Sequence, residues 1–581
     1  MPVFHFSPRE NRAHEINWFE WGNKAFDEAQ RHDKPILLAI SGTWCHWCHV
    51  MDETSYSDPQ VIKLINEHFI PIRVDTDQRP DINERYNMGG WPTTAFLTPQ
   101  GEPITGGTYI PPQQLKSLLK QINRLYHEQK EQIKEKARYL NLINTVVIRE
   151  PGKLKKEIYT HIVSSLKNAF DGEYAGFGIE LKFPMADALE LAAHQWLNHY
   201  DEKCGKIFLR TLDAMLSGGI YDHVEGGFFR YSTTRDWSIP HYEKMLEDNS
   251  RLLKILALAN YLTQNETYLK AAREILNWLE NTMFIPKLGC WAGSQDADEK
   301  YYSLSLEERK KTTPPRTDKN IYTNWNAMLV VSLFYFSRVA EDEKWEKKAL
   351  ETLVFLEKLN YDPQKGCAHY FDGHTARVHG LLMDQIMMGR GFTTAYQHLG
   401  NKEFLHKAEI LAQFCIQNLQ SPEGGFYDRM PNPEEPGMLS KPLMDIGQNA
   451  LAARWLLELE ALTGKELYGK TAVAALEAFG GFYREYGIAA SEYALAVYTA
   501  LNPWIKIEIT GSIHDNAYQK LWASALKSYV PNKVVNPLGS KDRAEGNKEA
   551  RAYVCRGAQC HRPATSASDL NMLIKRLATE K

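Results

Sequence analysis

Short apolar runs and amphipathic stretches alternate over the first part of the chain. Residues 36–40, Ile-Leu-Leu-Ala-Ile, are bounded by polar and turn residues, which is typical of a buried strand. Residues 70–75 and 94–97 show the same pattern, and residues 49–68 have helical spacing. The order strand, helix, strand and strand predicts a small α/β domain over residues 1–120.

From residue 157 to 501 the pattern changes to the spacing of helices that bury one face. Twelve such segments follow in pairs, separated by loops that join glycine to an aromatic residue, as in Gly226-Gly227-Phe228. The segments span residues 157–170, 187–200, 202–217, 244–264, 267–283, 324–340, 344–359, 381–400, 402–419, 447–463, 466–479 and 490–501. Repetition at about 50–75 residues indicates one repeated unit and predicts an (α/α)6 toroid with the loop aromatics lining its mouth. The alternative is an open α-solenoid.

Two shorter segments complete the expected organisation. Residues 121–156 are charged with helical spacing, which predicts a connecting helix or two with solvated faces. From residue 502 the pattern changes again. Strand-like alternation at 505–509 and a helical segment at 517–529 predict a small α/β subdomain over 502–581.

Composition and charge narrow the classes of partner. With 581 residues, length alone allows about three to five domains. The repeat lowers this number, because residues 157–501 are expected to form a single toroid. The formal net charge of −4 gives no reason to expect nucleic acid or an anionic membrane as partner. No apolar run approaches the ~20 residues needed to span a bilayer. The start of the chain has no signal-peptide pattern, so we expect a cytoplasmic protein with reduced thiols.

Cys45 and Cys48 form a Cys-x-x-Cys pair directly after the first predicted strand. A helix N-terminus favours the thiolate of Cys45, and Cys48, one turn later, could resolve a mixed disulfide. The alternatives are half of a zinc site or two buried thiols. His46 and His49 are near, but four ligands within five residues do not wrap a metal easily, so we expect neither metal nor cofactor. Near the C-terminus, Cys555 and Cys560 are expected to be structural thiols.

Polar residues recur where the inner helices of the predicted toroid begin. These are Asp248-Asn249, Asn324-Trp325-Asn326, Asp384-Gln385, Gln448-Asn449 and Ser491-Glu492. Helix capping alone explains each of them singly. If the toroid forms, however, all lie around one cavity, where carboxylates can accept hydroxyl groups and aromatic rings can stack on a sugar. We therefore expect Asp248, Trp325, Asn326 and Asp384 to bind substrate.

The densest cluster of chemistry-bearing side chains lies between residues 221 and 246. His223 and His241 are candidate acid/base groups, since histidine titrates near neutral pH. The neighbouring candidates for substrate binding are Asp222, Arg230, Tyr231 and Glu243, joined by Asp296 and Asp298 further along. The alternative is a structural network that makes the mouth rigid. A metal site is not expected here, because His241-x-Glu243 lacks the helical spacing of metal ligands.

These motifs together resemble the DUF255, spermatogenesis-associated protein 20 or YyaL-like family. The matching residues include Trp44-Cys45-His46-Trp47-Cys48-His49, Gly89-Gly90-Trp91-Pro92, Asp222-His223, Pro240-His241, Glu243-Lys244-Met245-Leu246, Asp296-Ala297-Asp298 and Trp325-Asn326. The resemblance covers nearly the whole chain. It implies a thioredoxin-like domain fused to a six-hairpin glycosidase-like domain similar to N-acylglucosamine 2-epimerases. It also implies that Pro92 is a cis-proline facing the cysteines.

Two departures qualify what the resemblance implies. Many thioredoxins carry a buried acid six residues before the first cysteine, and here that position is Ala39. The family pattern after Asp-Ala-Asp is also replaced, by Glu299-Lys300-Tyr301-Tyr302-Ser303.

The sequence therefore leads to one functional expectation and two alternatives. We expect a thiol-disulfide module fused to a toroid that binds a small carbohydrate and perhaps isomerises or hydrolyses it. The first alternative is a thiol-disulfide enzyme whose toroid recruits a protein disulfide or reductase partner. The second is a scaffold with no enzymatic activity.

Overall fold

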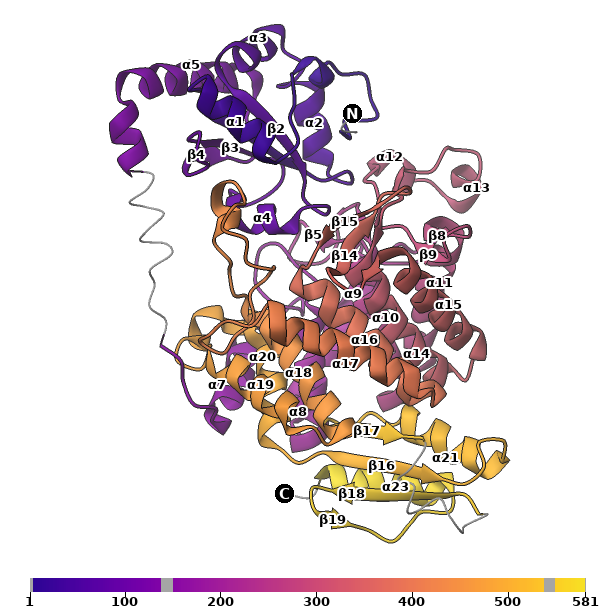
Figure 1. The fold of residues 1–581 in the computed structure, drawn as a ribbon. Helices are drawn as coiled ribbons and strands as arrows, with labels where there is room; N and C mark the ends of the chain where they lie inside the picture. Colours follow the sequence, from indigo (N-terminus) through magenta and orange to yellow (C-terminus); the bar gives the residue numbers. More distant parts are fainter. Residues whose placement is uncertain (1–3, 137–149, 538–548, 580–581) are drawn as a thin grey trace.

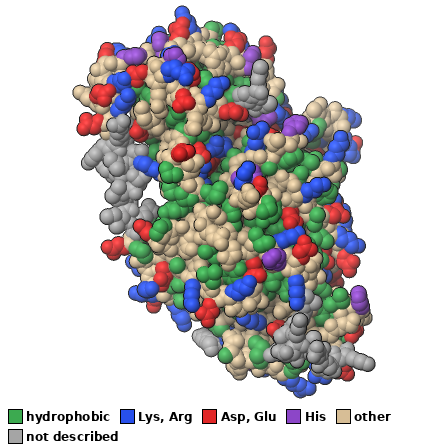
Figure 2. All heavy atoms as spheres, in the orientation of Figure 1, with side chains coloured by type: hydrophobic (Ala, Val, Ile, Leu, Met, Phe, Trp, Pro, Cys, Tyr) green, Lys and Arg blue, Asp and Glu red, His purple; other side chains and the backbone are tan. Residues whose placement is uncertain are grey.

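A computed structural model describes residues 4–136, 150–537 and 549–579. Figure 1 shows three parts stacked along one direction: the N-terminal α/β domain at one end, the helical body in the middle and the C-terminal subdomain at the other end. Acidic and basic side chains are interspersed over the face shown in Figure 2, in keeping with the small net charge. Part of the expected linker falls on residues 137–149, outside the described residues.

The N-terminal domain is thioredoxin-like. Its sheet has the order β2-β1-β3-β4, in which β1 and β2 are parallel and the other neighbours are antiparallel. The strands are β1 (Ile36–Ser41), β2 (Ile70–Asp75), β3 (Thr93–Leu97) and β4 (Pro103–Gly107), and the helices are α1 (Asn23–Arg31), α2 (His46–Glu53), α3 (Pro59–His68), α4 (Pro80–Tyr86) and α5 (Pro112–Glu128). Strands β1 to β3 are buried almost throughout, because their continuous apolar runs face helices on both sides.

The helical body is a closed toroid. Six inner helices contact one another in a ring: α8 (Ala186–His199), α10 (Leu246–Thr263), α14 (Thr323–Ala340), α16 (Leu382–Leu399), α18 (Ile446–Thr463) and α20 (Ser491–Leu501), which returns to α8. Outside them pack α7 (Lys156–Ala169), α9 (Glu202–Ser217), α11 (Glu266–Trp278), α15 (Glu343–Asn360), α17 (Lys402–Asn418) and α19 (Glu466–Glu477). All twelve predicted helices are present, and ring closure excludes the open solenoid. One helix differs, because residues 279–283 form a π-helical turn after α11.

Short strands and helices connect the hairpins at the end of the toroid that faces the N-terminal domain (Figure 1). They are β5 (Tyr231–Ser232), β6 (Pro240–His241), β7 (Lys244–Met245), β8 (Phe284–Ile285), β9 (Cys290–Trp291), β10 (Ser294–Gln295), α12 (Glu299–Tyr302), α13 (Leu306–Arg309), β11 (Thr317–Asp318), β12 (Ile321–Tyr322), β13 (Tyr361–Asp362), β14 (Gly366–Phe371) and β15 (Ala376–His379).

A side-chain amide clamps the preceding loop to the inner helix in four of the repeats. Asn249 accepts a hydrogen bond from the backbone N–H of Phe228 and donates to the carbonyl of the same residue. Asn449 does the same with Phe426, and equivalent pairs join Asn326 to Trp291 and Gln385 to Cys367. The rings of Phe228, Trp291 and Phe426 are fully buried. The expectation that these loop aromatics line the mouth is therefore wrong: the amide clamp directs them into the core.

The C-terminal subdomain is a four-stranded sheet in the order β17-β16-β18-β19 with two helices. Its elements are β16 (Ile505–Thr510), α21 (Asn516–Lys527), β17 (Lys533–Asn536), β18 (Arg551–Arg556), β19 (Gln559–Cys560) and α23 (Ala567–Thr579). Cys555 and Cys560 face each other across β18 and β19 and form a disulfide, so the expectation of free structural thiols is wrong. Their direct cross-strand pairing brings the two sulfur atoms into bonding range.

Candidate active site between the thioredoxin-like domain and the toroid

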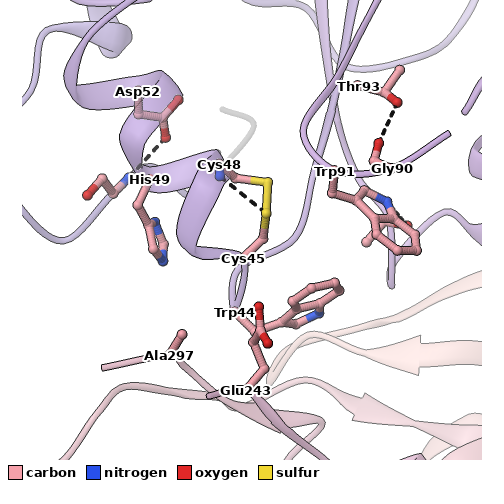
Figure 3. The surroundings of a disulfide bond; sticks show 12 residues. Trp44, Cys45, Cys48, His49, Asp52, Gly90, Trp91, Thr93, Glu243 and Ala297 are labelled. Carbon is pink, nitrogen blue, oxygen red and sulfur yellow. Dashed lines mark hydrogen bonds between the residues drawn. A yellow bond between two sulfur atoms is a disulfide. The ribbon is translucent and has the colours of Figure 1, made fainter. Parts of the chain in front are cut away.

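The Cys-x-x-Cys pair is oxidised and lies at the start of α2. Cys45 is the N-cap of this helix, its sulfur accepts a hydrogen bond from the backbone N–H of Cys48, 3.2 Å away, and the two cysteines form a disulfide (Figure 3). The Trp91–Pro92 peptide bond is cis, which confirms this part of the prediction for Pro92. Unpaired N–H groups at the helix start favour a thiolate at Cys45 after reduction.

The disulfide is enclosed by the toroid. Only 4% of Cys45 and 2% of Cys48 is exposed, and both pack in the same apolar cluster as the toroid helices. From the toroid, Glu243 and Ala297 reach the surroundings of the disulfide, and the carboxylate of Glu243 points toward Cys45 (Figure 3). A domain of about 120 residues thus presents its reactive pair to the second domain and not to bulk solvent.

One cluster of predicted residues lies beside the disulfide. His241 Nδ1 is 2.7 Å from both carboxylate oxygens of Glu243, whose side chain is completely buried. Arg230 Nε is 3.8 Å from Glu243, and its guanidinium lies 4.3 Å from the ring centroid of Trp44. The ring of Tyr231 stacks on His241. Four of the predicted site residues therefore form one cluster, which contacts the residue preceding Cys45 through Arg230.

A second contact joins α2 to the toroid directly. His49 Nε2 lies 3.0 Å from both carboxylate oxygens of Asp296, and both side chains are buried. Trp44 and Asp296 also line a groove of about 760 Å³ between the domains. The preceding histidine, His46, is half-buried, and burial lowers its pKa, so the neutral imidazole is favoured.

Buried ion pairs fasten the other side of the interface. Arg85 of α4 forms two hydrogen bonds to the carboxylate of Asp428, and Arg429 contacts Asp81 at 3.1 Å. His369 Nε2 lies 2.7 Å from the carbonyl oxygen of Asp77, while its Nδ1 pairs with the predicted site residue Asp384. Burial alone would lower the pKa of His369, but the charge of Asp384 outweighs it and the pKa is raised.

A cavity of about 250 Å³ separates the toroid mouth from the thioredoxin-like domain. Helix α4 and the segment around it contribute Thr76, Asp77, Pro80, Asp81, Asn83, Glu84 and Trp91, and the toroid contributes Glu247, Asn324, Trp325, His369, Leu381, Met383, Asp384, Asp428 and Gln448. The predicted residues Trp325 and Asp384 therefore share one cavity, at the N-termini of two adjacent inner helices. Desolvation and the nearby Asp428 raise the pKa of Glu84 to about 8.

Asp248 belongs to the first turn of α10, next to the cavity residue Glu247. Burial and the charge of Glu247 together raise the pKa of Asp248 to about 7, while Arg230 acts in the opposite direction. The carboxyl group is thus poised to gain or lose a proton near neutral pH, although a helix N-terminus favours its charged form.

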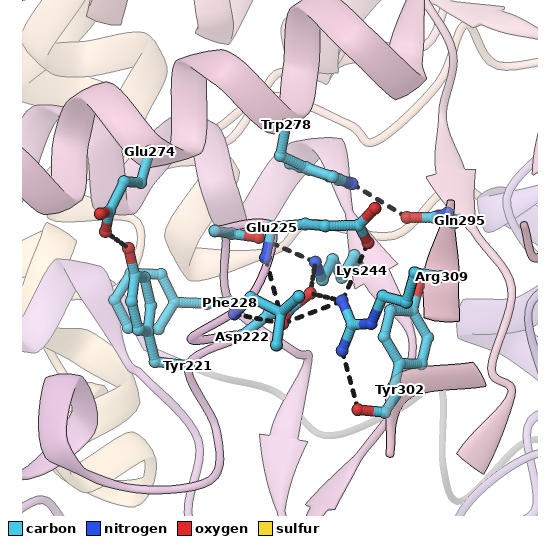
Figure 4. Close-up of polar contacts among 12 residues, drawn as sticks. Tyr221, Asp222, Glu225, Phe228, Lys244, Glu274, Trp278, Gln295, Tyr302 and Arg309 are labelled. Carbon is cyan, nitrogen blue, oxygen red and sulfur yellow. Dashed lines mark hydrogen bonds and ion pairs between the residues drawn. The ribbon is translucent and has the colours of Figure 1, made fainter. Parts of the chain in front are cut away.

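Asp222 forms part of a different, buried network (Figure 4). Its carboxylate contacts Lys244 Nζ at 2.6 Å and Arg309 Nη1 at 2.8 Å, and Arg309 also reaches Glu225 at 2.9 Å. Burial alone would raise the pKa of Asp222, but the two cations lower it. This arrangement matches the structural alternative for Asp222, because the carboxylate is fully occupied by protein partners.

Three predicted residues lie apart from the cavity. His223 is exposed, and its Nε2 is 3.0 Å from the carbonyl oxygen of Gly218. Asp298 is exposed and caps α12 by accepting hydrogen bonds from the N–H groups of Lys300 and Tyr301. Asn326 is buried and its amide is used by the repeat clamp. These placements fit capping and repeat packing.

The sequence analysis did not identify the residues that the thioredoxin-like domain contributes to the inter-domain site. Glu84, Asp77 and Trp91 line the cavity, and His49 holds Asp296. No local pattern marks them, because their role depends on docking segments that are hundreds of positions apart.

Among the described residues, no helix is long and apolar enough to cross a membrane. Within the same residues, no cluster of three or more His, Cys, Asp or Glu side chains is arranged to hold a metal ion.

Comparison with known proteins agrees with this architecture. Residues 8–144 match the family described as "Protein of unknown function, DUF255" (Thioredox_DsbH). Spermatogenesis-associated protein 20 from Homo sapiens is 24% identical, over 96% of this chain and 90% of its own length. Thiol:disulfide interchange protein DsbD from Campylobacter jejuni (strain RM1221) is 32% identical over 85 residues, which cover 14% of each chain.

The toroid is similar to a solved sugar-epimerase fold. Cellobiose 2-epimerase from Spirochaeta thermophila DSM 6192 superposes with a TM-score of 0.50 at 15% identity, covering 60% of this chain and 94% of the epimerase. At this level of identity the similarity establishes the fold alone.

Proposed function

Because residues 8–144 match the family described as "Protein of unknown function, DUF255", we propose that this protein is a thiol-disulfide oxidoreductase whose toroid controls what reaches the reactive pair. One observation carries the proposal: the Cys45–Cys48 disulfide lies at the N-terminus of α2, with Cys45 as the N-cap residue. The name of the related interchange protein DsbD supports the same chemistry.

The exchange needs only the two cysteines and a substrate disulfide. The Cys45 thiolate attacks one substrate sulfur, the substrate S–S bond breaks, and the first substrate thiolate leaves and takes up a proton. Cys48 then loses its proton and attacks Cys45, which releases the second substrate thiol and re-forms the Cys45–Cys48 disulfide. An external dithiol returns the pair to the reduced state. Each cycle transfers two electrons from that dithiol to the substrate.

The enclosure by the toroid supplies groups that the thioredoxin-like domain lacks. Ala39 stands where many thioredoxins have a buried acid, and the toroid brings the Glu243 carboxylate toward Cys45 (Figure 3). Through His241, which is partly exposed, Glu243 can exchange protons with solvent. Two of the free cysteines are poorly suited to exchange, because burial raises the pKa of Cys204 and Cys290 to about 12.

A carbohydrate-binding toroid is the second candidate. Trp325 and Asp384, at the start of two inner helices, face the inter-domain cavity and provide a ring face and a carboxylate. The epimerase similarity supports the fold of such a site and not its substrate.

A cytoplasmic location is likewise a prediction, which fractionation of expressing cells tests.

Turnover by the full-length protein tests the main proposal. Wild type and Cys45→Ser are compared for reduction of cystine and of insulin, with dithiothreitol as electron donor. We expect reduction by the wild type above the rate of dithiothreitol alone and none above that rate by Cys45→Ser. Equal rates for the two proteins would refute thiol-disulfide exchange. A thermal-shift screen with neutral sugars tests the second candidate, which fails if no sugar raises the melting temperature.

A further inference from the structure

The Cys45–Cys48 disulfide is enclosed between the two domains and leaves no room for a folded partner. Cys45 and Cys48 are almost completely buried, and Trp44 is held between Trp91 and Arg230. A protein disulfide would have to separate the two domains, which are joined by the buried Arg85–Asp428 pair and other contacts. The closed arrangement therefore favours a small substrate.

The cavity at the toroid mouth lies next to the reactive pair. Trp91 lines this cavity, immediately precedes cis-Pro92 and stands beside the disulfide in Figure 3. Its indole N–H donates to Thr76 and Asn83, which fixes the ring between cavity and disulfide. The ring of Trp91 thus lies between the cavity, which it lines, and Trp44, whose ring centroid is 5.6 Å away and which precedes Cys45. The volume of about 250 Å³ is at the small end for a ligand site.

The charges on the cavity wall are already balanced by the protein. Asp428 pairs with Arg85, Glu247 with Arg251, and Asp384 with His369. Burial raises the pKa of Asp77, and desolvation together with Asp428 raises that of Glu84 to about 8, so the Glu84 carboxyl group is largely neutral at pH 7. The cavity wall therefore does not favour a charged ligand.

What the wall offers is hydrogen bonding beside aromatic faces. The side-chain oxygen of Gln448 is buried and has no hydrogen-bond donor in the described residues, although its amide nitrogen is 3.4 Å from Glu84. Trp91 and Trp325 supply ring surfaces in the same cavity. Neutral hydroxyl groups on a compact ring match this combination, since hydroxyls both donate and accept and the C–H face of a sugar stacks on indole.

We propose that the substrate is a low-molecular-weight disulfide bearing a neutral sugar, with the sugar in the mouth cavity and the sulfur at Cys45. This inference rests on the proposed function and names its substrate class. The reduced Cys45–Cys48 pair gives two electrons to the substrate disulfide, releases two sugar-bearing thiols and becomes a disulfide. A dithiol, dithiothreitol in the assay, supplies the electrons and protons for the next cycle.

Two matched small disulfides test the proposal with the full chain. One consists of two cysteines, each amide-linked to the nitrogen of glucosamine, and the other is the disulfide of cysteine amide, which lacks the sugar. We expect kcat/KM to be at least about tenfold higher for the sugar-bearing disulfide. We also expect insulin to be the poorest of the three substrates.

Substitutions in the cavity separate sugar binding from a general effect on the protein. Trp325→Leu and Gln448→Ala should each reduce the preference for the sugar-bearing disulfide by about tenfold. Gln448→Ala provides the test if Trp325→Leu fails to fold. The control is Gln78→Ala, which removes the inter-domain bond to Tyr370 outside this cavity and should keep the preference.

Each outcome has a distinct meaning. Equal kcat/KM for the two small disulfides, or a preference unchanged in both cavity variants, would overturn the sugar-bearing substrate and leave thiol-disulfide exchange intact. Faster reduction of insulin than of either small disulfide would overturn the small-substrate argument. Failure to reduce any of the three above the rate of dithiothreitol alone would overturn the proposed function itself.

Discussion

The guanidinium of Arg230 lies 4.3 Å from the ring centroid of Trp44, so the toroid contacts the residue that immediately precedes Cys45. A cation–π contact of this kind contributes about 0.5–2 kcal/mol. In Arg230→Gln we expect the interface over Cys45 to loosen and dithiothreitol to reduce Cys45–Cys48 about 2- to 30-fold faster. Quenching with an alkylating reagent, followed by mass spectrometry of the cysteine peptides, measures the rate.

The control for this substitution is Arg235→Gln. Arg235 is also a toroid arginine with an acidic partner, Asp171, but it stacks on Tyr174 and not on Trp44. Its loss should leave the reduction rate of Cys45–Cys48 unchanged. If Arg230→Gln behaves like this control, Arg230 does not govern access to the disulfide.

The two disulfides should respond to a reductant in a fixed order. Cys560 is exposed and Cys555 partly so, whereas the Cys45–Cys48 pair is enclosed between two domains. Because exchange requires a thiolate to reach a sulfur atom, we expect native protein to lose the C-terminal disulfide first. In urea, where the enclosure is lost, the order should disappear. Differential alkylation measures the order in which the two disulfides are reduced, in the native protein and in urea. If Cys45–Cys48 is reduced before the C-terminal disulfide in the native protein, the disulfide is not enclosed.

Glu243 is expected to accept and donate protons during exchange at Cys45–Cys48. Its carboxylate is buried, points toward Cys45 and is hydrogen-bonded to His241 (Figure 3). Glu243→Gln keeps the shape but removes the proton acceptor, so disulfide exchange should slow by about 100-fold at neutral pH. The exposed neighbour Glu299→Gln is the control. A melting temperature that falls while the exchange rate stays constant would make Glu243 a structural residue only.

Local patterns and long-range contacts differ in how far the sequence could predict them. Periodicity located the twelve toroid helices, because it depends on neighbouring residues, whereas the cis bond at Pro92 was implied by the family resemblance. The pair His49–Asp296 spans 247 positions and exists only because two domains dock. For the clamp residue Asn326 the difficulty is different. The sequence shows where this residue lies, but it does not show its role, because helix capping, clamping and substrate binding all favour asparagine.

Asp248 predicts a specific pH dependence of stability. The folded protein holds its proton up to a pKa of about 7, above the ordinary value of 3.8, so it binds more protons than the unfolded chain between these two values. Stability from this group is therefore complete at low pH and is lost as the pH rises toward 7. Asp248→Asn should flatten the fall in melting temperature between pH 4 and pH 7. An unchanged slope would show that Asp248 titrates normally.

The network around Asp222 separates a structural role from a binding role. Arg309 is buried and contacts both Asp222 and Glu225, so Arg309→Ala leaves a buried carboxylate with one fewer cation (Figure 4). Breaking a buried ion pair in this way costs about 3–5 kcal/mol, and we expect urea denaturation to show a loss of that size. Glu225→Gln, at a partly exposed partner, should cost less than about 1 kcal/mol. If Arg309→Ala keeps full stability but loses disulfide exchange, Asp222 and Arg309 act on substrate and not on the fold.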